Sequence, residues 1–123
     1  MVPEPSSYNV YDRDCPSRTV LDLIANKWTV LVIGQLQDGT KRFSILKRGI
    51  DGISQKMLTQ TLRDLEKNGL VQRTIYAEVP PRVEYQLTAL GMKLIQPLNA
   101  LCDWAETYID AIHAANAAYN DRQ

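Results

Sequence analysis

Cysteine and histidine are scarce in this chain of 123 residues, which contains two cysteines and one histidine. There is no Cys-x-x-Cys pair, and Cys15 and Cys102 lie far apart in the sequence. Structural zinc sites draw four closely spaced ligands from Cys and His, and small secreted domains carry a denser set of cysteines. We therefore expect no metal site, no disulfide framework and no cofactor.

Long apolar runs are also missing. No uninterrupted apolar stretch approaches the roughly 20 residues that cross a bilayer, and the N-terminus lacks the apolar core of a signal peptide. Apolar residues make up 45% of the chain and charged residues 23%, a balance typical of globular domains. These totals predict one soluble, cytoplasmic domain with no membrane partner.

The residue patterns of an enzyme are absent as well. The sequence has no Gly-rich phosphate loop and no nucleophile elbow, and His113 falls in a C-terminal segment without a nearby acidic motif. We therefore expect a protein that is not an enzyme.

The net charge is zero, but the charges are distributed unevenly. Residues 41–82 contain nine basic and four acidic residues, a net charge of +5, which the rest of the chain balances with −5. A local field of one sign attracts a polyanion such as double-stranded DNA.

Residues 54–69 have two opposed faces when they are placed on a helix. Leu58, Leu62 and Leu65 recur at the spacing of a buried stripe. The opposite side carries a basic face of Lys56, Gln60, Arg63 and Lys67. Such a helix can lie in the major groove of DNA while it stays anchored to a domain. The alternative is an ordinary surface helix with a solvated basic face.

The neighbouring segments predict a winged helix-turn-helix, a mainly α fold with a small β-hairpin. Helices are expected from Pro16, from Lys27 to about Gln37 with Asn26 as cap, after Ser44, and after Ser54. Lys41-Arg42-Phe43 is expected to be a short extended link. Alternating residues 71–76 and 83–87 predict two strands, whose tip holds Pro80 and Pro81 and carries Arg82 outward.

A last helix, capped by Thr88, is expected to run to about residue 117. Its apolar residues recur at alternating spacings of four and three and form a seam of Leu94, Leu98, Leu101, Ala105, Tyr108, Ile112 and Ala115. We expect N- and C-terminal dimerisation helices that meet those of a second copy; the alternative is a terminal helix folded on its own core. The predicted limits are a flexible tail over 1–14, a domain over 15–117 with the dimerisation helix at 89–117, and a tail over 118–123.

The chain resembles the HxlR-type winged-helix transcription regulators, relatives of the MarR group. The resemblance covers roughly residues 15–110 and is carried by Cys15-Pro16, Lys27-Trp28, Arg42-Phe43-Ser44, Ile53-Ser54-Gln55-Lys56-Met57-Leu58-Thr59, Gly69-Leu70-Val71 and Tyr85-Gln86-Leu87-Thr88 with Gly91. It implies a cytoplasmic homodimer that binds operator DNA. In part of the family, a cysteine near the N-terminus senses electrophiles, quinones or disulfide stress.

When a helix-turn-helix binds DNA, the first turns of its second helix, the recognition helix, reach base edges, and flanking cations hold phosphates. In this chain the recognition helix is the one expected after Ser54. A twofold dimer implies a near-palindromic operator with half-sites about 34–36 Å apart. The predicted DNA-binding residues are Arg42, Lys47, Arg48, Ser54, Gln55, Lys56, Thr59, Gln60, Arg63 and Arg82.

Cys15 has two interpretations, a redox sensor or a small packed residue. A helix start and the nearby Arg13 and Arg18 favour the reactive thiolate, whereas Asp12 and Asp14 oppose it. Cys102 lies on an apolar stripe, which favours a buried structural thiol; otherwise it is a resolving partner for Cys15 across the dimer.

Two other functions stay open at this point. A small-molecule effector could bind between the winged domain and the dimer helices, in a pocket lined by Trp28, Tyr85, Trp104 and Tyr108, although these are also typical core and interface aromatics. Alternatively, the winged helix could be a protein-interaction module, which the basic face of residues 54–69 disfavours.

Overall fold

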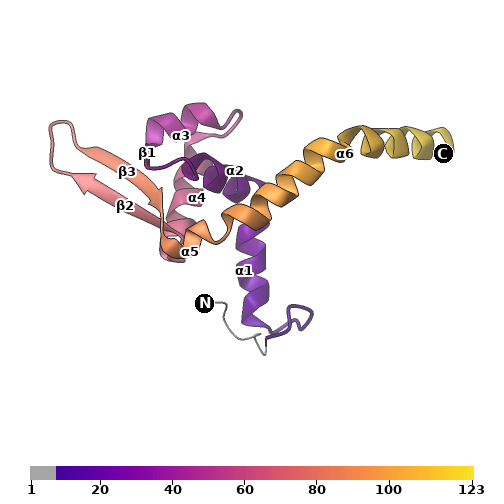
Figure 1. The fold of residues 1–123 in the computed structure, drawn as a ribbon, viewed down its shortest axis with the longest axis horizontal. Helices are drawn as coiled ribbons and strands as arrows, with labels where there is room; N and C mark the ends of the chain where they lie inside the picture. The colour runs from indigo at the N-terminus through magenta and orange to yellow at the C-terminus, as the bar shows by residue number, and fades with distance from the viewer. Residues whose placement is uncertain (1–7) are drawn as a thin grey trace.

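The computed structural model describes residues 8–123, and residues 1–7 of the predicted tail lie outside the described part. Six helices and three strands cover most of these residues, and the hairpin projects away from the helices (Figure 1). A mainly α winged helix with a small sheet is therefore confirmed. The elements are α1 (Pro16–Ile24), α2 (Lys27–Leu36), β1 (Lys41–Arg42), α3 (Phe43–Gly49), α4 (Gln55–Lys67), β2 (Val71–Tyr76), β3 (Arg82–Leu87), α5 (Ala89–Met92) and α6 (Ile95–Asp121).

The core lies where α2, α3 and α4 meet the base of the sheet. The predicted stripe of α4 is fully covered, and Leu58 and Leu65 are 0% exposed. Burying one such leucine contributes roughly 1.5–3 kcal/mol. The core residues are Val32, Ile33, Leu36, Leu46, Ile50, Ile53, Leu58, Leu62, Leu65, Leu70, Val71, Leu87 and Leu98.

Helix α2 is rotated from the orientation that the sequence predicted. Val32 and Leu36 face inward as expected, but Ile33 is also buried, whereas Leu31 is exposed and Trp28 only half-buried. The buried positions 29, 32, 33 and 36 follow the three- and four-residue spacing of one helical face. Leu31 lies off that face and lines a cleft against α6.

Three predicted helix caps are confirmed. Asn26 Oδ1 accepts a hydrogen bond of 2.8 Å from the Trp28 amide, and Ser54 Oγ accepts one of 3.0 Å from the Met57 amide. Thr88 Oγ1 accepts one of 3.1 Å from the Gly91 amide. Helix α3 begins earlier than predicted, at Phe43 with Arg42 as N-cap. Arg42 already has the extended backbone of an N-cap because it ends β1.

The sheet has three antiparallel strands in the order β1-β3-β2, so the predicted hairpin carries an additional edge strand. The predicted extended link is this strand: Lys41 pairs with Tyr85 and Arg42 with Glu84. Two residues are too few for the alternation that identifies a strand, which is why the sequence did not predict it. At the base of the hairpin, Val71 lies opposite Leu87, and both are buried.

The predicted C-terminal helix is interrupted between α5 and α6. Pro97 falls in the first turn of α6, where a missing N–H costs nothing, whereas inside a continuous helix it would break the backbone ladder. Helix α6 then runs past residue 117 to Asp121, so most of the predicted C-terminal tail is helical. Figure 1 shows its C-terminal half leaving the body of the domain.

The described part of the predicted N-terminal tail contains a hydrogen-bonded turn. The Asp12 amide donates to the Asn9 carbonyl at 3.0 Å, and the Cys15 amide donates to the Asp12 carbonyl at 3.1 Å. This turn leads directly into α1, which starts at Pro16 as expected.

Candidate nucleic-acid interface

Helix α4 presents a polar face to solvent opposite its buried stripe. Gln55, Lys56, Gln60 and Arg63 are exposed, and Ser54 caps the N-terminal end of the same helix. Because the leucine stripe is held by the core, the orientation of this polar face is fixed by packing.

Further cations precede α4 along the chain. Lys47 and Arg48 occupy the last turn of α3, and Arg42 ends β1; all three are exposed. Within residues 8–123, the only basic residues in ion pairs are Arg73 and Arg82. The cations of α3 and α4 are therefore not neutralised by the described chain, so their charge remains available to an anion.

The side chain of Gln60 is hydrogen-bonded within α4. Its Nε2 donates to Asp64 Oδ1 at 3.0 Å, one helical turn further on. This bond restricts the amide rotamer but leaves Oε1 and the second N–H unused, so the side chain keeps an acceptor and a donor.

Thr59 lies at the border of the polar face. It is half-buried and lines a cleft between α4 and the sheet together with Arg63 and Tyr85. It is therefore less accessible to base edges than Lys56 or Gln60, which lie nearer the centre of the face.

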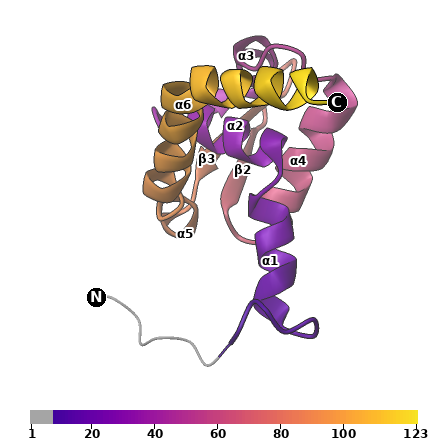
Figure 2. The ribbon, with the colours of Figure 1, turned by 90° about the vertical axis from the view of Figure 1, so that its right-hand side faces the viewer.

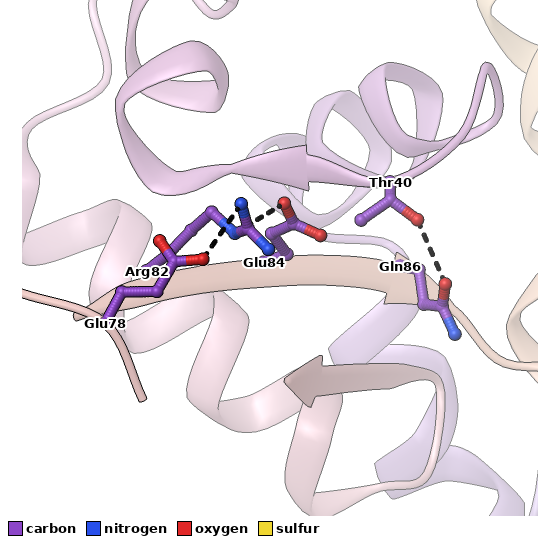
Figure 3. A network of polar contacts seen from close by, with 5 residues as sticks. All are labelled: Thr40, Glu78, Arg82, Glu84 and Gln86. Carbon is purple, nitrogen blue, oxygen red and sulfur yellow. Dashed lines mark hydrogen bonds and ion pairs between the residues drawn. The ribbon is translucent and has the colours of Figure 1, made fainter. Parts of the chain in front are cut away.

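Arg82 does not project from the wing tip as the sequence predicted (Figure 3). Its Nη1 lies 3.3 Å from Glu78 Oε1, and its guanidinium carbon lies 4.1 Å from the centroid of the Tyr76 ring. Its buried Nε is 3.3 Å from Glu84 Oε2 but makes no hydrogen bond. Residue 82 begins β3, so its side chain folds over the outer sheet face instead of extending from the tip.

A second contact in Figure 3 ties the chain before β1 to the hairpin. Thr40 Oγ1 lies 3.0 Å from Gln86 Oε1, to which its hydroxyl donates. The outer sheet face is thus held by polar contacts at both ends of β3, and this keeps the hairpin fixed against the segment that leads into α3.

The four aromatic residues considered for an effector pocket are dispersed. Trp104 and Tyr108 contact each other on α6 with ring centroids 5.3 Å apart. Tyr85 lines the cleft between α4 and the sheet, and Trp28 is not among that cleft's lining residues. The structure does not unite them around one site.

The two cysteines occupy different environments. Cys15 is 8% exposed at the N-cap of α1, directly after the preceding turn. Cys102 is half-buried and lines a cleft of about 270 Å³ between α2 and α6. The start of α1 and helix α6 lie apart in Figures 1 and 2.

No helix in residues 8–123 is long and apolar enough to cross a membrane. Within the same residues, Cys, His, Asp and Glu do not gather in groups that could hold a metal ion.

Comparison with known proteins assigns this arrangement to a family. A family model described as an HxlR-like helix-turn-helix matches residues 23–113. The uncharacterized HTH-type transcriptional regulator YtfH of Escherichia coli (strain K12) is 44% identical over 106 residues, which cover 86% of this chain and 84% of that protein.

Solved structures agree with the sequence match. The transcriptional regulator ytfH from Salmonella typhimurium has a TM-score of 0.84 and 42% identity, over 90% of this chain and 99% of that chain. The redox regulator HypR in its oxidized form has a TM-score of 0.70 and 41% identity, over 76% of this chain and 96% of that chain. The chain belongs to the HxlR-like helix-turn-helix family, whose members are DNA-binding transcriptional regulators and not enzymes.

Proposed function

We propose that this chain is a homodimeric, sequence-specific regulator whose α4 enters the major groove of a near-palindromic operator. The observation that carries this proposal is the two-sided character of α4. Its leucine stripe is buried, while Lys56 and Arg63 on the other side have no ion-pair partner within residues 8–123. We place its activity in the cytoplasm, since its target is genomic DNA.

The proposed contacts divide into base readout and phosphate binding. Gln55, Lys56 and Gln60 lie nearest the groove floor, where a glutamine amide can pair with adenine. Arg42, Lys47 and Arg48 hold backbone phosphates on the approach to α4, and the Ser54 hydroxyl lies at the start of the helix. Arg82 is engaged with two glutamates, so it contributes to wing geometry more than to DNA contact.

The dimer proposal follows from apolar surface that one chain leaves uncovered. Leu101 and Trp104 are 56% and 55% exposed, and α1 has no buried residue. An apolar groove of about 260 Å³ lies between α1 and α5 and is lined mostly by Val20, Leu23, Ile24, Leu70, Leu90 and Leu94. Exposed apolar surface of this extent marks an interaction site. A second copy supplies matching surface and places two α4 helices about 34–36 Å apart.

The DNA-binding roles are tested with two substitutions on operator and scrambled duplexes. Operator fragments are first selected from genomic DNA with the reduced protein. Gln60→Ala should relax sequence preference, because it removes a base contact. Arg42→Ala should weaken binding to every sequence and reduce the salt dependence by about one unit. Arg122→Ala, at the far end of α6, is the control. Equal losses on both duplexes for both variants would refute the division of roles.

A redox response through Cys15 is supported by its place at the start of α1, one of the two helices with uncovered apolar surface. The similar regulator HypR has been solved in oxidized and reduced forms. Cys15 is the N-cap of α1, and the start of α1 lies apart from α6 within one chain (Figures 1 and 2), so a bridge to Cys102 would join two chains. Formation of that bridge removes two electrons and two protons from two thiols, which an oxidant such as diamide accepts.

This response is tested by DNA binding before and after diamide or quinone treatment. Wild-type protein should change its affinity, because the bridge alters how the α1 helices meet and thereby the half-site spacing. Cys15→Ser should not respond, and Cys102→Ser separates a cross-chain bridge from modification of Cys15 alone. An identical response of wild type and Cys15→Ser would eliminate Cys15 as the switch.

A further inference from the structure

A polar cleft of about 260 Å³ lies between the recognition helix and the hairpin. Arg73 on β2 is directly opposite Tyr85 on β3. Both residues lie on the sheet face that carries Val71 and Leu87, which packs toward the core and α4. The lining residues are Thr59, Leu62, Arg63, Glu66, Arg73 and Tyr85.

The lining has the composition of an anion site. It combines two guanidinium groups, two hydroxyls and a single carboxylate, so its net charge is +1. The carboxylate, Glu66 Oε1, lies 3.5 Å from Arg73 Nε, and no second carboxylate pairs with Arg73 in residues 8–123. Arg63 has no ion-pair partner there either.

Tyr85 is suited to donate in this cleft. Burial raises the pKa of its phenol above 10.0, although the charge of Arg73 acts to lower that pKa and Glu66 acts to raise it. The phenol is therefore neutral at physiological pH and keeps its O–H. Thr59, half-buried on the opposite wall, supplies a second hydroxyl.

The position of the cleft indicates which anion it binds, namely a phosphate of the DNA backbone. With α4 in the major groove and the hairpin beside the adjacent minor groove, one sugar-phosphate strand must pass between them. We propose that this cleft binds one backbone phosphate of each operator half-site, through Arg73 and Arg63 as cationic contacts and Tyr85 and Thr59 as hydroxyl donors. This inference rests on the proposed function, and it adds Arg73 and Tyr85 to the DNA contacts.

An isolated structural ion pair is the competing explanation for Arg73. The pair with Glu66 is half-exposed, with 45% of the Arg73 side chain and 40% of the Glu66 side chain accessible, and such pairs contribute little to stability. The two explanations predict opposite effects on DNA affinity when Glu66 is removed. For an ion pair, loss of either partner weakens the hairpin and thus DNA binding; for a phosphate site, Glu66 competes with the DNA.

The test compares Arg73→Gln, Glu66→Gln and Tyr85→Phe on an operator duplex of about 30 base pairs, which spans two half-sites. Arg73→Gln should lower affinity roughly tenfold and reduce the salt slope by about one. Glu66→Gln should raise affinity, and Tyr85→Phe should lower it several-fold at an unchanged slope. Arg122→Gln is the matched control for loss of a surface arginine.

Replacing single phosphates by neutral methylphosphonates locates the contact. In wild type, neutralising the phosphate in the cleft should reduce affinity, as should neutralising the phosphates held by the cations before α4. In Arg73→Gln, the position in the cleft should have no further effect, whereas the other positions should keep theirs. Thermal unfolding of each variant verifies that it is folded. If Glu66→Gln and Arg73→Gln both lower affinity, or if Arg73→Gln retains every phosphate effect that wild type shows, the site is refuted while the proposed function stands. If wild type binds no DNA, the proposed function is refuted and the site with it.

Discussion

Helices α4 and α6 both carry a regular apolar stripe, but only that of α4 is covered by its own chain. Leu58, Leu62 and Leu65 are at most 2% exposed, because α2 and the base of β2 pack over them. On α6, Leu98 is buried, whereas Leu101, Tyr108 and Ile112 are each more than 40% exposed. Both helices have the same kind of apolar spacing. They differ in whether other elements of the same chain pack against the stripe.

This difference separates two requirements of a twofold DNA-binding protein. One chain is sufficient to build and orient a reading surface, since the core that fixes α4 is complete within residues 8–123. The distance between two such surfaces is not set by one chain. We attribute that task to α6, whose C-terminal half extends away from the domain (Figure 1).

The largest expected effect comes from charging the α6 stripe. Leu101→Glu combined with Ile112→Glu should produce a folded monomer, because neither side chain belongs to the core. Operator affinity should fall by a factor of about 100 or more, since the second half-site no longer binds in the same molecule. Sedimentation equilibrium and fluorescence anisotropy measure the two effects.

Thr107→Glu is the matched control, because it adds a charge to an exposed α6 position away from the stripe. Dimer mass and affinity should stay close to wild type in this variant. A double variant that kept the dimer mass would show that α6 is not the interface. The uncovered stripe of α6 would then not be explained by a second copy.

The α4 stripe should respond in the opposite manner, with loss of folding stability. Leu58→Ala removes a fully buried side chain and should lower the free energy of unfolding by about 2–5 kcal/mol. Met57→Ala, at the exposed neighbouring position, should change it by less than about 1 kcal/mol. Urea denaturation at one protein concentration measures both. Equal losses would mean that the two faces of α4 are not distinct.

The junction between the two regions is tested at Gly91. A Cβ at this position would collide with the carbonyl oxygen of Leu70, so Gly91→Ala must displace α5 or the start of β2. We expect a loss of about 1–3 kcal/mol in unfolding free energy. Gly34→Ala is the control, because no heavy atom beyond its chain neighbours and the local backbone of α2 lies within 4 Å of its Cβ position. That substitution should stabilise α2 by up to about 1 kcal/mol, and a loss there comparable to that of Gly91→Ala would contradict the steric argument.

The sequence predicted best where a local pattern has a local cause. The stripe of α4 and the caps Asn26, Ser54 and Thr88 follow from helical periodicity and hydrogen-bonding capacity within a few residues, and all are found. Strand β1 was missed because its two residues become a strand only by pairing with β3. For the last helix, the sequence predicted a bend or offset of the first turns at Pro97 but not the separate α5, since a proline shows that a helix is disturbed but not where it restarts.

In the candidate site, too, local features were predictable from the sequence and features that depend on long-range pairing were not. The exposure of Lys56 and Gln60 follows from the period of α4 alone. The partners of Arg82 could not be predicted, because Glu78 and Glu84 approach it only when the hairpin closes. Arg73 carried no signal either; its place beside Tyr85 depends on the strand register.

The smallest expected effect distinguishes two roles of Ser54 at the start of α4. Its Oγ already caps the helix, so Ser54→Ala should cost about 1 kcal/mol of unfolding free energy. Ser54→Asp keeps an acceptor for the Met57 amide and should retain stability, but its negative charge faces the phosphates that the helix start approaches. If Ser54 lies against DNA, Ser54→Asp binds DNA several-fold more weakly than Ser54→Ala although it is the more stable of the two. If Ser54 is only a cap, affinity follows stability and the order is reversed. Helix α6 has no side-chain cap, so of the two helices compared only α4 offers this test.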